Sequence, residues 1–228
     1  MGADSLITVH HLENSRSQRV LWLLEELGCE YEIKRYERDP KTSLAPAELK
    51  AIHPLGKSPV ISDGDTVVAE SGAIVEYLVD RFGGSSMRPE ADTPEYLQYR
   101  YWLHYAEGTL APLLVMSLIF RRIETAPMPF FIRPIAKGIS AKVKQSYLGP
   151  NLDANLQFME QHLQAHAWFA GDSFTAADVM MSFGLEAAAT RSGMQQNYPA
   201  LAKMLQTMQA RPAYQRALER GGPYSLMS

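Results

Sequence analysis

The chain has 228 residues, of which 46% are hydrophobic and 21% are charged, and its formal net charge is −3 at pH 7. This composition predicts a globular protein with a packed core, and the scattered Lys and Arg residues exclude a basic stripe for nucleic acid. The single cysteine, Cys29, excludes an internal disulfide and a Cys-x-x-Cys redox or zinc site, and it fits a reducing compartment.

The amino terminus shows no basic segment followed by an apolar core, and no apolar run reaches the roughly 18 residues that span a bilayer. We therefore expect a cytoplasmic protein with neither a membrane nor a nucleic acid as partner.

The first part of the chain carries strand and helix signals in turn. Residues 6–12 are β-branched and mostly apolar, as in a buried strand, and apolar residues then recur at helical spacing from 20 to 27. Either Ser15 or Ser17 offers the N-cap of that helix. Residues 31–36 alternate as a half-buried strand.

A short helix over 46–51 and a hairpin around the turn at 63–65 come next, and a helix over 71–82 closes the unit. This order of elements predicts a thioredoxin-like α/β domain over residues 1–83, with a mixed sheet and helices on both faces.

Residues 84–94, rich in Gly, Ser and Pro, predict a linker, and strand signals vanish beyond it. Amphipathic stretches predict an all-helical bundle over residues 95–228. Three prolines, Pro127, Pro129 and Pro134, predict a break between two helices of a hairpin. Thr175 and Asp178 have the spacing of a capping box.

Pro59 stands at the start of a β-branched run, which predicts an edge, a bulge or a cis turn, and Ser58–Pro59 is the cis candidate. In the cis form the main chain of Ser58 points outward and can pair with an extended peptide. Glu70 and Ser71 end a strand and open a helix, where a carboxylate and an ammonium group can both be bound. One ligand can carry both groups.

The order strand, Ser58–Pro59, short strand, Glu70–Ser71 and helix resembles the glutathione site of the cytosolic glutathione transferases. The run from Asn14 to Leu27 and the run Ile-His-Pro-Leu-Gly-Lys-Ser-Pro before Val60 look most like a serine-type microbial branch shared by fungi and bacteria. The resemblance implies the glutathione transferase fold, a homodimer, and an enzyme with glutathione as co-substrate.

A glutathione transferase must ionise the glutathione thiol, whose ordinary pKa is near 8.5. Lowering this pKa by about two units requires roughly 2.7 kcal/mol. A hydroxyl donor and a helix amino terminus can together supply that free energy. The resemblance implies Ser15 as the catalytic donor to the sulfur, with the adjacent Asn14 amide as the alternative.

The other site residues follow from the same resemblance. The main chain of Ser58 would bond the cysteinyl backbone, and Glu70 and Ser71 would hold the γ-glutamyl amine and carboxylate. Lys57 would meet a carboxylate of the tripeptide. His53 either reaches the glycyl carboxylate or serves as a local turn former. Of the two arginines in the loop and helix that follow the first strand, Arg16 either reaches the anionic ligand or is solvated, and Arg19 is expected in an internal ion pair or a domain contact.

The electrophile site is expected between the domains, along the first long helix of the bundle, although aromatic and Met residues at this spacing are also typical of a core. The candidates are Tyr101, Trp102, Tyr105, Leu113, Met116 and Phe120. Met128, Phe130 and Phe131 are candidates for a lid.

The sequence thus predicts an enzyme that conjugates the glutathione thiolate to hydrophobic electrophiles, as in detoxification, with peroxide reduction as a side activity and with no metal. The alternative is a module of the same fold that binds glutathione without turnover. A thiol–disulfide oxidoreductase is disfavoured because no cysteine lies in the donor loop, and Cys29 is expected to be a small buried hydrophobe.

Overall fold

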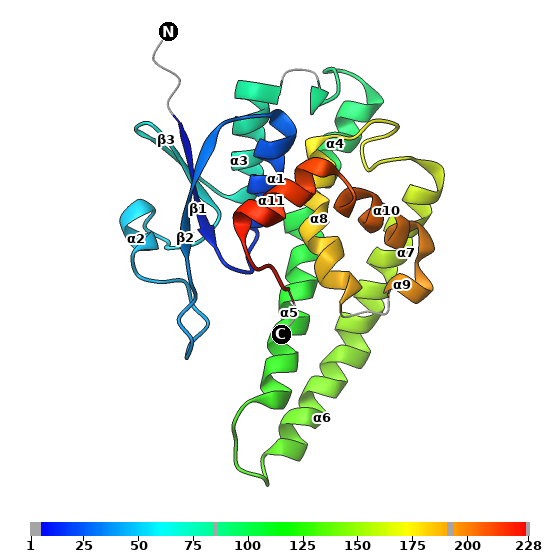
Figure 1. Cartoon of the computed structure of the whole chain (residues 1–228). Coiled ribbons are helices and arrows are strands. Elements are labelled where there is room, and N and C mark those ends of the chain that lie inside the picture. Colours follow the sequence, from blue (N-terminus) through cyan, green and yellow to red (C-terminus); the bar gives the residue numbers. More distant parts are fainter. Residues whose placement is uncertain (1–5, 84–85, 191–193, 227–228) are drawn as a thin grey trace.

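The computed structural model describes residues 6–83, 86–190 and 194–226, and Figure 1 shows a sheet unit packed beside a larger set of helices. The sheet has the order β2-β1-β3-β4, in which β1 and β2 are parallel and the other two pairs are antiparallel. The central strand β1 is almost wholly buried, because helices cover both faces of the sheet, whereas β2 alternates. The four strands are β1 Ile7–Leu12, β2 Tyr31–Tyr36, β3 Val60–Asp63 and β4 Thr66–Ala69.

Two helices, α1 (Ser17–Leu27) and α3 (Ser71–Leu78), cover the face of the sheet that looks toward the helical half (Figure 1). A π-helical turn, η1 (Val79–Gly83), extends α3. The opposite face carries α2 (Leu49–Ile52), whose Leu49 packs against Leu12 and Tyr36. This arrangement confirms the predicted thioredoxin-like unit with helices on both faces.

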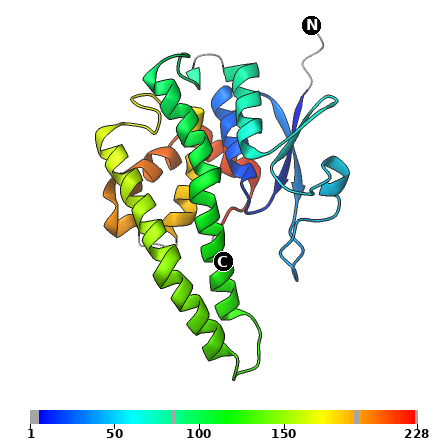
Figure 2. The ribbon, with the colours of Figure 1, turned by 180° about the vertical axis from the view of Figure 1, so that it is seen from behind.

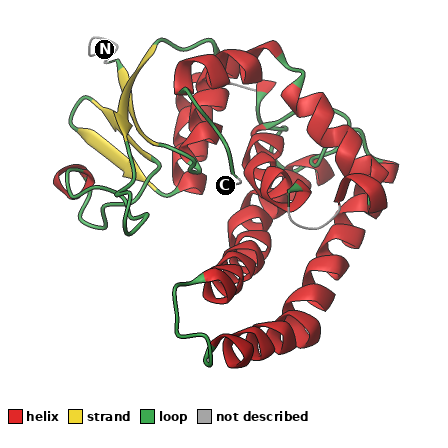
Figure 3. Cartoon of the chain, turned by 60° about the horizontal axis from the view of Figure 1, so that its bottom comes forward, coloured by secondary structure: helices red, strands yellow, loops and turns green. Residues whose placement is uncertain are grey.

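The rest of the described chain after η1 is helical, as predicted, and Figure 3 shows the two kinds of structure separated. The break predicted at the three prolines lies between α5 and α6, which form a hairpin that projects from the body (Figures 2 and 3). The elements are α4 Pro94–Tyr105, η3 Ala106–Leu110, α5 Ala111–Thr125, α6 Arg133–Val143, η4 Lys144–Leu148, α7 Gly149–Ala165, α8 Ala176–Ala189, α9 Met194–Asn197, α10 Pro199–Gln209 and α11 Pro212–Gly221.

The helix α8 is the centre of the helical half, since nearly all of its residues are buried. The predicted capping box is present at its start. The Asp178 carboxylate accepts hydrogen bonds from the main-chain N–H groups of Thr175 at 2.8 Å and Phe169 at 2.9 Å. The box therefore joins the start of α8 to the loop that precedes it.

The continuous helical stretch Pro94–Thr125 is long and apolar enough to cross a membrane by length and composition, which the sequence analysis did not expect. A third of its apolar window is buried inside the protein. Trp102, Leu110 and Leu114 of this stretch belong to the main hydrophobic core. The stretch thus contributes side chains to the core of the protein.

Candidate functional site

The loop between β1 and α1 carries Asn14 and Ser15, the two candidate donors to the glutathione sulfur. Asn14 has a left-handed backbone with φ of 48°, which Asn tolerates better than most residues. The guanidinium of Arg38 donates to the main-chain oxygens of Glu13 at 3.3 Å and Asn14 at 3.4 Å. A residue that follows β2 therefore holds the bent loop in place.

The Ser15 side chain is buried and takes part in a chain of hydrogen bonds inside the protein. Its Oγ lies 2.7 Å from the Ser17 Oγ and accepts from the Ser17 main-chain N–H at 3.2 Å. The Ser17 Oγ lies 2.8 Å from Nδ1 of His11, which is also buried. Burial, and then the charge of Arg35, lower the pKa of His11 from 6.5 to about 4, so this imidazole is neutral at pH 7.

The Ser58–Pro59 peptide bond is cis, as predicted. The Ser58 hydroxyl donates to the main-chain oxygen of His10 at 2.9 Å and accepts from the N–H of Leu12 at 3.3 Å. The ladder between β1 and β3 ends at the pair of His10 and Val60, so the main chain of Ser58 lies just beyond it. Ser58 is thereby fixed against the end of β1, next to the donor loop.

Glu70 and Ser71 open α3. Glu70 is exposed and has φ of 73°, and Ser71 is the first residue of the helix. Arg19 of α1 donates to the Ser71 Oγ at 3.0 Å, which leaves the hydroxyl hydrogen of Ser71 for an anionic ligand. The same contact joins the start of α3 to the start of α1, so Ser71 lies at the end of the sheet that carries the donor loop.

Arg19 is the contact between the two halves that the sequence predicts. Its buried guanidinium donates to the main-chain oxygen of Met180 on α8 at 2.7 Å and pairs with Glu107 in η3. Arg16 lies 3.2 Å from the other Glu107 oxygen, so both arginines pair with the same carboxylate. In this structure Arg16 therefore has a protein partner.

His53 and Lys57 lie between α2 and β3. Lys57 is exposed, as a residue that meets a ligand carboxylate must be. His53 ends α2, and its Nδ1 is buried without a hydrogen-bond partner among the described residues. No contact in the described structure joins either side chain to Ser58 or Ser71.

Three of the predicted electrophile-site residues face away from the sheet unit. Trp102 is fully buried and stacks on Phe158 of α7 and on Phe169. The Tyr105 hydroxyl donates to Asn155 of α7, and the Tyr101 ring packs against Trp102. Trp102 is a core residue in this structure, which is the alternative that the helical spacing left open, and Tyr101 and Tyr105 share its contacts with α7.

The other aromatic and Met candidates lie farther along the hairpin. Met116 and Phe120 are partly exposed on α5, and the Phe120 main-chain oxygen accepts from Ser140 of α6. Phe130 and Phe131, the proposed lid, are exposed at the hairpin tip, where their rings contact each other. No described contact joins these residues to the donor loop.

Cys29 follows α1 and packs partly buried against the main core, as expected for a small hydrophobe. Burial raises the pKa of its thiol, so the reactive thiolate is disfavoured. This agrees with the sequence, which disfavours a thiol–disulfide oxidoreductase because no cysteine lies in the donor loop.

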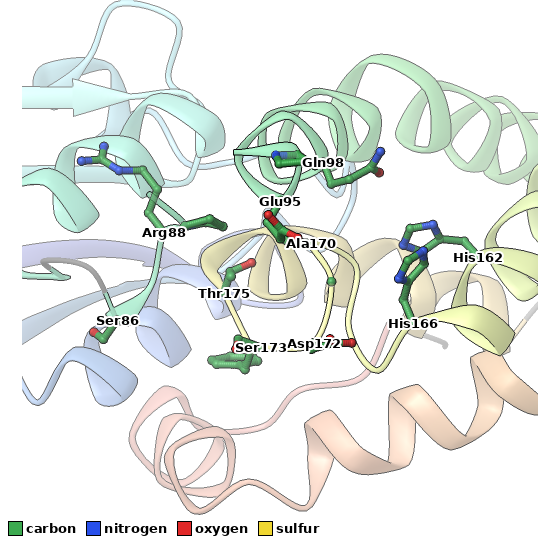
Figure 4. Close-up of a pocket in the computed structure, with 14 residues that line it drawn as sticks. Ser86, Arg88, Glu95, Gln98, His162, His166, Ala170, Asp172, Ser173 and Thr175 are labelled. Atoms are coloured by element: carbon green, nitrogen blue, oxygen red, sulfur yellow. The ribbon is translucent and has the colours of Figure 1, made fainter. Parts of the chain in front are cut away.

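A cavity of about 640 Å³ lies in the helical half, away from the donor loop (Figure 4). It is bounded by the segment before α4, by α4 itself, by the end of α7 and by the loop before α8. No residue of the sheet unit lines this cavity, so the cavity does not coincide with the predicted glutathione site. Its polar lining includes Arg88, Glu95, Gln98, His162, His166 and Asp172.

Sequence reasoning did not find a buried acid and two tyrosines beside the donor loop. Glu186 of α8 accepts hydrogen bonds from the hydroxyls of Tyr214 and Tyr224, the latter at 2.6 Å. The main-chain N–H of Ser225 donates to Oδ1 of Asn14 at 2.6 Å. No local motif marks these residues, because their partners lie 28 to 211 positions away along the chain.

Comparison with known proteins gives two family matches. Residues 4–80 match the glutathione S-transferase N-terminal domain, and residues 122–212 match the glutathione S-transferase C-terminal domain. "Glutathione S-transferase 3" of Schizosaccharomyces pombe is 36% identical over 94% of this chain and 88% of its own length. "Glutathione S-transferase 1" of Saccharomyces cerevisiae is 35% identical over 94% of this chain and 95% of its own length.

Solved structures agree. A glutathione S-transferase of Actinobacillus pleuropneumoniae is 33% identical, with a TM-score of 0.76 and coverage of 95% of this chain and 93% of that one. A glutathione transferase of Phanerochaete chrysosporium, solved with oxidized glutathione, has the same TM-score at 19% identity and covers 97% of both chains, which shows likeness of fold.

Proposed function

Because the chain belongs to the glutathione S-transferase family and is a glutathione transferase, we propose that it transfers the glutathione thiolate to hydrophobic electrophiles, with peroxide reduction as a side activity. One observation carries this proposal. The donor loop, Ser58 and Ser71 are tied to the same end of the sheet, through the bonds of Ser58 to β1 and of Arg19 to Ser71.

In this proposal glutathione is the co-substrate and lies along this end of the sheet. The main chain of Ser58 lies beyond the last pair of the ladder with β1, where an extended cysteinyl backbone can add as a strand would. Ser71 offers a hydroxyl hydrogen and a first-turn N–H to the γ-glutamyl carboxylate, and the exposed Glu70 offers a carboxylate to the amine. Lys57 and His53 are assigned to the glycyl end.

The thiol then lies beside the donor loop and the start of α1. A hydrogen bond from Asn14 or Ser15 to the charged sulfur contributes roughly 1.5 to 3 kcal/mol, and the helix amino terminus contributes about 0.3 to 1 kcal/mol more. These contributions are close to the roughly 2.7 kcal/mol that lowers the thiol pKa by two units. No metal is needed for this step.

For the electrophile we propose the face of α5 that looks toward the sheet unit. The charge of Arg122 on α5 contributes to the lowered pKa of Arg38, after burial, which supports a position of this face of α5 on the side of the donor loop. Val115 and Leu118 precede Arg122 by seven and four residues, so they share its face. Both are at least partly exposed, unlike Trp102.

We also propose a homodimer, in which the sheet unit of one protomer packs against the helices of the other. Leu97, Ile119 and Ile123 form an exposed apolar stripe along α4 and α5, and Val67 of β4 is exposed on the sheet unit. Burial of such side chains in a second copy would stabilise the pair. A cytoplasmic location is proposed because the thiol of Cys29 is free.

A conjugation assay tests the proposal. Purified protein, glutathione and 1-chloro-2,4-dinitrobenzene should give saturable formation of the thioether, monitored by absorbance, and calorimetry should show glutathione binding. Ser71→Ala should weaken glutathione binding, whereas Ser146→Ala, at an exposed serine of η4, should not. Glutathione binding without turnover over a panel of halides, epoxides and enals would instead favour the non-catalytic module.

A further inference from the structure

The segment that follows α11 lies against the donor loop. Figure 1 shows it in red, leaving the end of α11 beside β1 and α1. Its Tyr224 hydroxyl is anchored on the buried carboxylate of Glu186, and the next residue, Ser225, donates its main-chain N–H to Oδ1 of Asn14 at 2.6 Å. We call residues Gly222–Ser225 the C-terminal strap.

The strap determines which way the Asn14 amide faces. Only the oxygen of a side-chain amide can accept a hydrogen bond, so the bond from Ser225 identifies Oδ1 and directs the NH₂ group away from the strap. Arg38 holds the Asn14 main-chain oxygen, so the base of the side chain is fixed as well. Within the described residues the NH₂ group of Asn14 has no hydrogen-bond partner, so both of its N–H donors are available to a ligand.

The hydroxyl of Ser15, in contrast, is directed into the protein. The Ser17 hydroxyl donates to the main-chain oxygen of Leu12 at 3.3 Å, because that oxygen can only accept. Nδ1 of the His11 ring lies 2.8 Å from the same Ser17 oxygen. The Ser17 oxygen, with its hydrogen committed, accepts from the Ser15 hydroxyl at 2.7 Å. The single hydrogen of Ser15 is thereby used inside the protein.

We propose that the C-terminal strap is part of the catalytic site, and that it orients the Asn14 amide so that Asn14, rather than Ser15, donates a hydrogen bond to the glutathione sulfur. This proposal rests on the proposed function. Asn14 is the catalytic residue, and Tyr224, Ser225 and Glu186 are positioning residues that act through it. Ser15 and Ser17 instead hold the start of α1 against His11.

The test measures the pKa of the bound glutathione thiol by titrating thiolate absorbance, together with kcat and the glutathione Kd. Asn14→Ala should raise the thiol pKa by about one unit and lower kcat about tenfold near neutral pH. Ser15→Ala should leave the thiol pKa within a few tenths of a unit of the wild type. A reversed result would overturn the assignment of the donor.

The strap itself is tested by a matched pair at one position. Ser225→Pro removes the main-chain N–H that holds Asn14 and should raise the thiol pKa as Asn14→Ala does, whereas Ser225→Ala keeps the N–H and should raise the thiol pKa less than Ser225→Pro does. The double variant Asn14→Ala/Ser225→Pro should show no further change, because both substitutions remove one interaction. Tyr224→Phe should raise the thiol pKa by a smaller amount, with an unchanged glutathione Kd.

The outcomes separate the two proposals. The wild type can lower the thiol pKa while Ser225→Pro leaves that pKa unchanged. This result overturns the role of the strap and leaves the proposed function standing. A wild-type protein that neither lowers the thiol pKa nor conjugates glutathione overturns the proposed function, and the strap proposal with it. Circular dichroism of each variant confirms that the comparison is between folded proteins.

Discussion

Arg19 on α1 and Glu107 in η3 form an ion pair that joins the sheet unit to the helical half. The same guanidinium donates to Met180 on α8 and to Ser71 at the start of α3, so one side chain binds three helical elements to its own. The start of α3 is thus joined to η3 and α8 through a single buried cation.

Replacement of this cation should be costly. Arg19→Met removes the guanidinium bonds to the Met180 oxygen and the Ser71 hydroxyl and leaves Glu107 with one partner, and the free energy of unfolding should fall by about 3 kcal/mol. Arg16→Met, at the more exposed partner of Glu107, should cost less than about 1 kcal/mol. Urea unfolding followed by circular dichroism measures both, and equal losses would contradict the special role of Arg19.

The capping box of α8 should be a second determinant of stability. Asp178→Ala removes the acceptor for two buried main-chain N–H groups, and the free energy of unfolding should fall by about 3 kcal/mol. Asp172→Ala, at an exposed acid six residues earlier, is the matched control and should change stability by less than about 0.5 kcal/mol. Thermal unfolding would show whether the two variants separate as expected.

The buried His11 should make the fold sensitive to acid. Its pKa is lowered to about 4 in the folded chain, so below pH 6.5 the unfolded chain binds a proton that the folded chain does not. Stability should therefore fall between pH 6.5 and pH 4, by up to about 3 kcal/mol from this group. The groups that face the ring are Arg35, Ser17 and the Gly221 carbonyl.

The corresponding measurement is the free energy of unfolding between pH 4 and pH 7.5 for the wild type and for His11→Gln. The variant should be less stable at pH 7.5 and should lose less on acidification. His104→Gln, at an exposed position, should keep the wild-type slope. An unchanged slope in His11→Gln would exclude His11 as a cause of acid sensitivity.

Substitutions on α5 should distinguish the two faces considered for the electrophile. Leu118→Ala should raise KM for a hydrophobic halide about fivefold and leave KM for glutathione unchanged, because apolar contact with only one substrate is lost. Tyr101→Ala, on the face toward α7, should leave KM for the halide unchanged. Steady-state kinetics with each substrate varied in turn measures both KM values. A larger effect of Tyr101→Ala than of Leu118→Ala on KM for the halide would contradict the proposed face of α5.

The apolar stripe on α4 and α5 should control association. Ile119→Glu and Ile123→Glu place charges on the proposed interface and should convert a dimer to a monomer in size-exclusion chromatography with light scattering. Leu44→Glu, at a more exposed apolar residue of the loop before α2, should leave the dimer intact. A monomeric wild type would remove the dimer from the proposed function.

Much of the fold could be predicted because its signals are local. The cis bond at Ser58–Pro59, the capping box at Thr175 and the break at the three prolines each depend on residues within a few positions of one another. The order of the two units, an α/β unit followed by an all-helical one, also follows from such local patterns, and the family matches confirm this order.

The surroundings of the site could not be predicted in the same way. Helical spacing shows that Trp102 lies on an apolar face, but it does not say whether α7 or the sheet unit covers that face. The contacts of Asn14 with Ser225 and of Glu186 with Tyr224 join distant segments without a motif. The direction of the hydrogen bond between Ser15 and Ser17 depends on the contacts of Ser17 with Leu12 and His11, which only the tertiary structure brings together.

The bond between Asn14 and Ser225 also has a bearing on synthesis. On the ribosome the loop after β1 emerges early, but its partner is added 211 residues later. A nascent chain can therefore fold its sheet unit long before that loop is finished. For the same reason a purification tag should be fused ahead of Met1, because one appended after Ser228 would lie three residues from a contact made by the donor loop.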